Sequence, residues 1–322
     1  MIEVSLIIPV LNEESSIELL VSSIQNQTRV PNEIIFVDGG STDKTIEIIE
    51  SFSSADSSFK LVKAGQATPG RGRNIGVENA RYKWIAFTDS GIRLDPDWLD
   101  ILVKVVEKND SIDIVYGNCE VRIENFFEQC ATFAYVSPRQ FKDGEWWRGP
   151  FIASSLLRRE VWESVGGFPD IRAAEDLIFM EAVEKAGFKI DYAPRAKVIW
   201  QLRPDITSTF QKFVLYSKHN VWVNREWDWH YGILKQYLVI LPFFILGLIH
   251  SWWWLLVIVF WGFIRTAKRI FAHHNQFGLG SLINPVIFFE VMFIIFIVDI
   301  ATFIGWGEAL FQGKPESSLV ND

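Results

Sequence analysis

Short apolar runs alternate with amphipathic segments along the first part of the chain. The strand-like runs are Val4 to Val10, Ile34 to Val37, Lys60 to Val62, Trp84 to Thr88 and Asp113 to Tyr116. The segments with helical spacing are Ser16 to Ile24, Lys44 to Phe52, Asn74 to Ala80 and Asp97 to Val106. Because neighbouring parallel strands need crossover helices, this alternation predicts an α/β fold with a mostly parallel sheet covered on both faces.

The pattern changes after residue 230. From Ile233 to Ile264 almost every residue is apolar, and Leu282 to Phe303 is similar apart from a few positions that include Glu290 and Asp299. Runs of this length are typical of membrane helices. We therefore predict two regions: a catalytic domain over residues 1–230 and a membrane-associated helical region over residues 231–322.

The first apolar run, 233–264, is too long for one membrane span of about 20 residues and too short for two. His250 and Ser251 offer a break, so we predict a hairpin that returns Arg265 and its basic neighbours to the side of the catalytic domain. That side is cytosolic if positive charge marks the cytoplasmic face. Residues 282–303 form a further segment, in which Asp299 is expected to face protein or headgroups. In a bacterium the membrane would be the inner one.

Composition and charge narrow the function classes. The chain has 322 residues and a net charge of −8, and this charge lies in residues 1–230 because acids and bases cancel beyond them. An acidic body argues against nucleic acid as a partner. Two cysteines are too few for a disulfide framework, which favours a reducing compartment, and we expect no cleavable leader before the first strand.

Acidic residues stand where predicted elements begin or end. Asp38 follows one apolar run, Asp89 follows another, and Glu175 and Asp176 open a helical segment after a glycine turn. Ligands of α/β sheets bind beyond the carboxyl ends of the strands, so these acids predict an active site. A dinucleotide-binding dehydrogenase is excluded, because the turn at Leu11 lacks the required glycine pattern.

Six motifs, taken in their order along the chain, resemble glycosyltransferase family 2. They are Ser5 to Glu13, Val37 to Asp43, Gly70 to Gly76, Phe87 to Gly91, Gly166 to Phe168, and Glu175 with Asp176. This resemblance covers roughly the first two thirds of the chain. It implies a Rossmann-like GT-A fold, a nucleotide-diphosphate sugar as donor, and transfer with inversion of the anomeric carbon.

The resemblance also implies roles for particular residues. Donor-binding roles fall on Pro9, Asn12, Glu13, Asp38, Arg71, Arg73, Asn74 and Asp89. Asp38 suits a nucleotide contact because a carboxylate accepts strong hydrogen bonds, but it could equally orient its own turn. We predict that Arg71 and Arg73 lie in a loop of small residues, where a guanidinium can bind phosphate oxygens. Of the two, we favour Arg73, followed by Asn74.

The sequence Asp89-Ser90-Gly91 stands in the place of the family's metal-binding Asp-x-Asp. A divalent cation there, Mg²⁺ or Mn²⁺, would stabilise the charge on the departing nucleoside diphosphate. Gly91 supplies no second carboxylate. We therefore expect a cation at Asp89, bound less conventionally than by a complete motif.

Catalysis is assigned to the acidic pair. Asp176 is expected to be the general base that takes the proton of the acceptor hydroxyl, with Glu175 as the neighbour that tunes it. Trp146, Trp147 and Arg148 are expected on the acceptor side. Adjacent tryptophans cannot both face the same side of a strand, so one is free to serve as a platform for a sugar ring or a lipid headgroup.

The sequence thus predicts a membrane-bound inverting glycosyltransferase that acts on a lipid-linked or membrane-proximal acceptor hydroxyl, with the lipid bilayer as a partner. One alternative is a nucleotide-binding pseudoenzyme that serves as a membrane assembly partner, which the incomplete metal motif keeps open. Another is a polysaccharide synthase. It is disfavoured by the few membrane spans and by the lack of a Gln-x-x-Arg-Trp motif.

Overall fold

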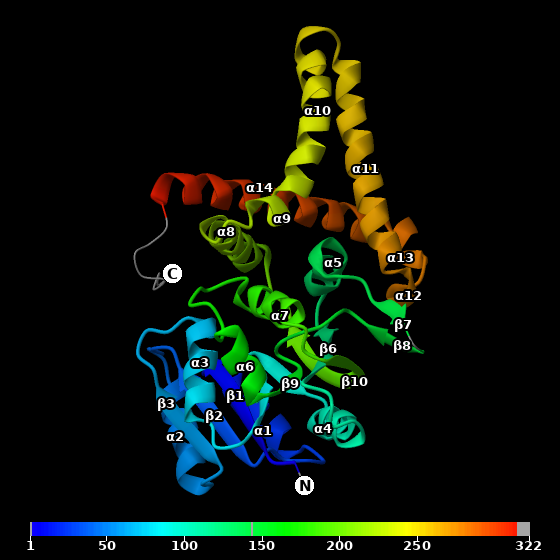
Figure 1. Cartoon of the computed structure of the whole chain (residues 1–322). Coiled ribbons are helices and arrows are strands. Elements are labelled where there is room, and N and C mark those ends of the chain that lie inside the picture. Colours follow the sequence, from blue (N-terminus) through cyan, green and yellow to red (C-terminus); the bar gives the residue numbers. More distant parts are fainter. Residues whose placement is uncertain (1, 143, 314–322) are drawn as a thin grey trace. The chain divides into compact units, whose positions relative to one another are not determined.

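The computed structural model describes residues 2–142 and 144–313 and divides into two compact units (Figure 1). Unit 1 comprises the chain up to Arg122 together with Gln140 to Gln201. Among the described residues, unit 2 comprises Ile123 to Arg139 and Leu202 to Gly313. The functional division at residue 230 stays a prediction, because compactness alone does not assign a function to either part.

Unit 1 is built on an eight-stranded sheet in the described part of the chain, with the order β3-β2-β1-β4-β9-β6-β10-β5. The strands are β1 (Val4–Val10), β2 (Glu33–Asp38), β3 (Phe59–Lys63), β4 (Trp84–Phe87), β5 (Ile92–Leu94), β6 (Ile114–Arg122), β9 (Ser155–Arg158) and β10 (Ile190–Gln201). Strands β3, β2, β1 and β4 run parallel, as do β6 and β10. The predicted mostly parallel sheet is confirmed. The antiparallel strands β5 and β9 were not among the predicted strands.

Helices cover both faces of this sheet, because successive strand residues point in opposite directions. In β1, Leu6 and Ile8 join a core with α1 (Ile17–Gln25), α2 (Thr45–Ala55) and α4 (Trp98–Lys108). Ile7, between them, joins a second core with α3 (Pro69–Asn79), α6 (Arg159–Val165) and α7 (Glu175–Lys185). A short hairpin of β7 (Gln140–Lys142) and β8 (Glu145–Trp147) completes unit 1.

Helix α3 corrects one expectation from the sequence. Arg71 and Arg73 do not lie in a loop, because the helix begins at Pro69 rather than near Asn74. Thr68 caps it by accepting a hydrogen bond from the Arg71 amide at 3.2 Å, and proline is favoured in the first turn of a helix. The glycines that suggested a loop instead let the helix approach the sheet.

The closest approach of α3 to the sheet is at Gly76. A Cβ added to Gly76 would lie 2.3 Å from Cγ2 of Ile7, and one added to Gly72 would lie 3.2 Å from Cβ of Pro9. These glycines are four residues apart and therefore share one face of the helix. Larger residues here would push α3, and with it Arg73, away from β1.

Unit 2 is helical. Its helices are α5 (Phe126–Tyr135), α8 (Ile206–Trp222), α9 (Glu226–Trp229), α10 (Tyr231–Ile249), α11 (Leu255–Ala272), α12 (His274–Phe277), α13 (Gly280–Ile283) and α14 (Pro285–Gln312). Helices α10 and α11 form an antiparallel pair that turns at His250 and the Trp252–Trp254 3₁₀ turn (Figure 1).

Two helices of the described residues, α10 and α14, are long and apolar enough to cross a membrane. Only 6% of the apolar window in α10 is buried, against 39% in α14. The 19 residues of α10 extend roughly 28 Å, close to the thickness of about 30 Å of a bilayer core. The helices lie where the hairpin and the further segment were expected, and their insertion into a membrane stays a prediction.

A cluster of polar and charged side chains joins α10, α11 and α14. Asp299 of α14 is 1% exposed and accepts a hydrogen bond from the Tyr237 hydroxyl of α10 at 2.8 Å. Arg265 of α11 contacts both oxygens of the same carboxylate. Asp299 therefore faces protein, as the cost of an unpaired acid among apolar helices requires.

Substituting Gly76 by alanine should destabilise unit 1 by about 1–3 kcal/mol, because the added methyl group overlaps Ile7. Gly91→Ala is the matched control, since the nearest atom to its added Cβ is Oε1 of Glu13 at 4.0 Å. Chemical or thermal unfolding of the two variants measures the difference. Equal stability of both variants would show that α3 shifts without cost.

Candidate active site

The site is built at the carboxyl ends of three neighbouring parallel strands, β2, β1 and β4. Asp38 ends β2 and pairs in register with Val10, the last residue of β1. Phe87 ends β4 and pairs with Ile7, and Asp89 follows two residues later. The predicted meeting of Asp38, the turn after β1 and Asp89 at one edge of the sheet is therefore what this topology produces.

The turn after β1 is tied to the loop after β2 by hydrogen bonds. The Asn12 amide donates to Oγ of Ser41 at 2.9 Å, and Oδ1 of Asn12 accepts from the Thr42 amide at 2.8 Å. The Glu13 amide donates to Oγ1 of Thr45 at 2.7 Å. Asn12 has a φ of 54°, a left-handed conformation that asparagine tolerates better than most residues. These contacts fix the shape of the edge on which a donor would lie.

Asp38 is 2% exposed and serves its own turn. Oδ2 accepts from the Gly40 amide at 3.0 Å, and Oδ1 accepts from the Ser41 amide at 3.1 Å. A Cβ at Gly39 would lie 2.8 Å from the carbonyl oxygen of Ala67, which explains why glycine rather than a second acid follows Asp38. The turn-orienting role left open by the sequence is present, and the nucleotide contact stays a prediction.

Arg73 lies at the centre of the charged groups. Its side chain is 3% exposed, and Nη2 pairs with Oδ1 of Asp89 at 2.7 Å while Nη1 pairs with Oε1 of Glu175 at 2.8 Å. These carboxylates raise the pKa of Arg73 despite the opposing effect of burial. Both terminal nitrogens are thus engaged by protein acids, and Nε is buried without a hydrogen-bond partner among the described residues. Because the side chain is 3% exposed, a phosphate could reach its remaining N–H groups only if the site rearranged.

Arg71 and Asn74 have different surroundings. Arg71 is exposed, and none of the described acids forms an ion pair with it. Asn74 holds the turn at Phe168: Nδ2 donates to the Phe168 carbonyl at 2.7 Å, and Oδ1 accepts from the Phe168 amide at 2.8 Å and from Nε1 of Trp162 at 2.9 Å. The structure therefore gives Asn74 a role in positioning this turn and leaves Arg71 as the accessible arginine of α3.

The acidic pair begins helix α7. Burial raises the pKa of Glu175 to about 7, with Arg73 acting against the shift and Asp176 adding to it. Burial also raises the pKa of Asp176, opposed by Arg73 and assisted by Asp89. Asp176 is half-buried, and its Oδ1 accepts from the Leu177 amide at 2.8 Å. A carboxylate with a raised pKa is a stronger base than an exposed one, which suits the predicted role.

Asp89 is the residue at which the sequence predicts a cation. Among the described residues, no group of three or more His, Cys, Asp or Glu side chains could hold a metal ion by itself. The Asp89 side chain is 39% exposed and gives one oxygen to Arg73, so its other oxygen is available. Magnesium is commonly bound by one or two carboxylates together with substrate phosphates. The residues present fit a cation that binds together with a diphosphate.

Two of the acceptor-side candidates, Trp146 and Trp147, face opposite sides of β8. Trp146 is 37% exposed and lies 4.9 Å from the ring of Phe141, whereas Trp147 is 8% exposed and packs against Tyr192. The expectation that the two tryptophans face opposite sides is met, and Trp146 is the one that could form a platform. Arg148 is buried, with Nη2 3.7 Å from Oε2 of Glu120.

Phe168 is a site residue that the sequence marked only as part of a turn motif. The guanidinium of Arg73 lies 5.4 Å from the centre of its ring, and the ring stacks on Phe179 at 4.0 Å. Cations bind favourably to the faces of aromatic rings. Its place directly after the two glycines was the available signal, but only the fold brings it against α3.

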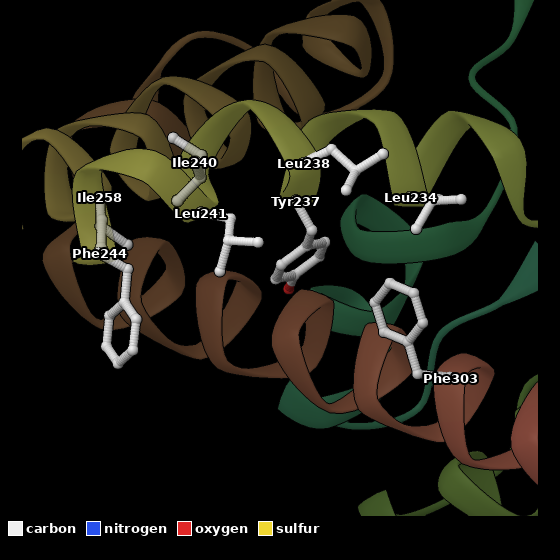
Figure 2. A pocket seen from close by; sticks show the side chains of 8 residues that line it. All are labelled: Leu234, Tyr237, Leu238, Ile240, Leu241, Phe244, Ile258 and Phe303. Atoms are coloured by element: carbon white, nitrogen blue, oxygen red, sulfur yellow. The ribbon is translucent and has the colours of Figure 1, made fainter. Parts of the chain in front are cut away.

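Unit 2 contains a pocket that is lined by apolar side chains, unlike the charged site of unit 1. It has a volume of about 420 Å³ and is lined by Leu234, Tyr237, Leu238, Ile240, Leu241, Phe244, Ile258 and Phe303 (Figure 2). These side chains come from α10, α11 and α14, and Tyr237 alone among them carries a polar group. This lining suits a hydrocarbon rather than a sugar or a nucleotide.

Comparison with known proteins gives a family match. Residues 5–165 match the model of Glycosyl transferase family 2. The chain is 34% identical over 122 residues to the putative glycosyltransferase EpsH of Bacillus subtilis, covering 38% of this chain and 35% of EpsH. It is 29% identical over 195 residues to the glycosyltransferase AglE of Haloferax volcanii, covering 59% of this chain and 64% of AglE. The matches therefore span less than two thirds of either relative.

Among solved structures, the mannosyltransferase PcManGT of Pyrobaculum calidifontis has a similar fold, with a TM-score of 0.62 at 15% sequence identity. The match covers 97% of this chain and 88% of PcManGT, which was solved in complex with GDP-mannose and Mn²⁺. This similarity supports the expected GT-A fold.

Proposed function

Because the chain belongs to glycosyltransferase family 2, we propose that it transfers a sugar from a nucleotide-diphosphate donor to an acceptor hydroxyl, with inversion at the anomeric carbon. One observation carries this proposal: Asp89, Arg73 and Glu175 form one connected charged network beside Asp176, at the carboxyl edge of the sheet. A mere binding module would not need a half-buried acid with a raised pKa at this edge.

In this proposal Asp176 is the general base. It takes the proton of the acceptor hydroxyl while the acceptor oxygen forms a bond to the anomeric carbon, and the bond from that carbon to the diphosphate oxygen breaks. The nucleoside diphosphate leaves with the electron pair of that bond. Asp38, Asn12 and Glu13 lie on the donor side, and Arg71 is the exposed cation available to the diphosphate.

Divalent cation binding is part of the proposal. Asp89 would hold the ion, which when bound neutralises charge on the leaving diphosphate. The Mn²⁺ in the PcManGT complex supports this assignment, and Mg²⁺ remains equally suitable on chemical grounds. Because Gly91 contributes no carboxylate, we infer that the cation binds more weakly than at a complete Asp-x-Asp.

We also propose that the acceptor is lipid-linked or lies at the membrane, with the catalytic unit on the cytosolic side. Apolar side chains of α10 remain widely exposed, including Leu248 at 68% and Ile249 at 76%. Contiguous exposed apolar surface of this kind is typical of membrane contacts. The apolar cavity of about 420 Å³ gives a hydrocarbon chain a place in the same unit.

Asp176→Asn should reduce sugar transfer by about 10²–10⁴-fold while leaving nucleotide affinity nearly unchanged, because an amide keeps the shape of the side chain but cannot take a proton. Transfer to a membrane extract and calorimetry with UDP and GDP measure the two quantities. Near-normal transfer by a folded variant would remove Asp176 from the role of base.

Gly91→Asp should tighten the binding of Mn²⁺ in the presence of a nucleoside diphosphate, because it restores the second acid in a place with room for a side chain. Gly91→Asn is the matched control, since it adds similar volume without the charge. Calorimetric titration of the chelator-treated protein measures the affinity. Equal affinities in the wild type and both variants would argue against a cation at Asp89.

The full chain should stay with the membrane on carbonate extraction, because the α10–α11 pair exposes apolar side chains along its length. Replacing Leu248 and Ile249 by glutamate should weaken this retention, since a charged side chain is unfavourable in contact with lipid. Replacing the exposed Leu19 of unit 1 in the same way is the control. Release of the wild type as a folded, monodisperse species would contradict membrane insertion.

A further inference from the structure

Arg73 is a cation of α3 whose side chain is 3% exposed and whose acidic partners lie on two other segments. From α3 its side chain reaches Asp89, two residues after the end of β4, and Glu175, the first residue of α7. The separations along the chain are 16 residues to Asp89 and 102 residues to Glu175. A single side chain thus fixes the distance between the acid expected at the donor phosphates and the segment that carries the expected base.

The surroundings of Arg73 leave little freedom to rearrange. Its guanidinium lies against the ring of Phe168, which also packs edge-on against Phe87 at 5.3 Å. Gly70, three residues earlier, is held so close to the carbonyl oxygen of Pro169 that an added Cβ would lie 2.2 Å from it. A phosphate ligand of Arg73 would have to reach a side chain that is 3% exposed and would compete with two charge-assisted bonds to carboxylates.

The charges around Arg73 are unbalanced. One guanidinium faces Asp89 and Glu175 directly and also acts on Asp176. Without it, Glu175 and Asp176 would lose the positive charge that favours their ionised forms. The charge of Arg73 therefore acts to lower the pKa of the expected base Asp176, while the second oxygen of Asp89 stays available.

We propose that Arg73 is a positioning residue and not a ligand of the donor phosphate: its two ion pairs hold Asp89 and the start of α7 in place beside Asp176. This inference rests on the proposed function for its meaning in catalysis. It replaces the expectation that Arg73 grips the diphosphate and leaves that task to the exposed Arg71.

The test compares Arg73→Gln and Arg73→Lys with the wild type, with Arg81→Gln as a control that makes the same change at an exposed site beyond α3. Arg73→Gln should lower kcat by about 10–100-fold, the loss usual for a supporting residue, and change the Kd for UDP or GDP by less than about threefold. The acid limb of its kcat/KM profile should move to higher pH, because Arg73 holds the pKa of Asp176 down. Arg73→Lys should restore the position of this limb but not the full rate.

A phosphate ligand would give the opposite pattern. A loss of nucleoside diphosphate affinity of tenfold or more in Arg73→Gln, with an unshifted pH profile, would overturn the proposal.

A second measurement does not depend on turnover. Glu175 has a raised pKa of about 7 against an ordinary 4.5, so its contribution to stability is present below pH 4.5 and is lost as the pH rises toward 7. Arg73→Gln should raise the pKa of Glu175 further. The melting temperature of this variant should therefore continue to fall as the pH rises above 7. In the double variant Arg73→Gln with Glu175→Gln, this additional fall of the melting temperature above pH 7 should be absent.

Melting temperatures of wild type, single and double variants between pH 5 and pH 9 supply this comparison. Parallel curves for the wild type and Arg73→Gln would overturn the proposal even if the protein transferred no sugar. Absence of transfer by the wild type together with the expected melting curves would instead count against the proposed function alone.

Discussion

The arrangement of the catalytic edge depends on one buried guanidinium held between two carboxylates. Arg73 joins helix α3, the segment after β4 and the start of α7, which are far apart in the sequence. Breaking a buried ion pair by removing one partner costs about 3–5 kcal/mol, yet such pairs often add little net stability over an apolar packing. Their retention at the carboxyl edge of a sheet is therefore better explained by the placement of charges than by stability.

The packing that carries Arg73 follows from the glycines of α3. Gly72 and Gly76 let the helix lie directly on β1, and Gly70 lets its first turn meet Pro169. The amide of Asn74 then fixes the turn at Phe168 with three hydrogen bonds. Residues that would read as ligands in isolation thus form the support of the site, and Asp38 supports its own turn in the same way.

Unit 2 combines exposed apolar helices with a buried ion pair. Its helices expose many apolar side chains, and the buried Asp299 among them is paired with Arg265. The contact of Arg265 and Tyr237 with Asp299 ties α10, α11 and α14 together while removing an unpaired acid from apolar surroundings. An apolar cavity lies among the same helices (Figure 2). These features support the proposed membrane setting and the proposed lipid-linked acceptor.

The amino-acid sequence by itself determined the parallel strands β1 to β4 and the start of β6, because strands buried on both faces must be continuously apolar and their crossovers must be amphipathic. The parallel strand β10 was not predicted. It also determined that Asp38 and Asp89 lie at one edge, since both end strands that run in the same direction. The apolar segments after residue 230 were equally evident from composition. Helix α3 was misjudged, because glycines that serve close packing have the same composition as a loop.

Only the tertiary structure decided which acids are partners. No local pattern brings Glu175 to Arg73, as the contact arises from the packing of α7 beside α3 on one face of the sheet. The antiparallel strands β5 and β9 were missed for a similar reason, because short strands are stabilised by neighbours distant in sequence. Burial and long-range charge pairing set the chemistry of a side chain, and both are properties of the packed chain rather than of its local sequence.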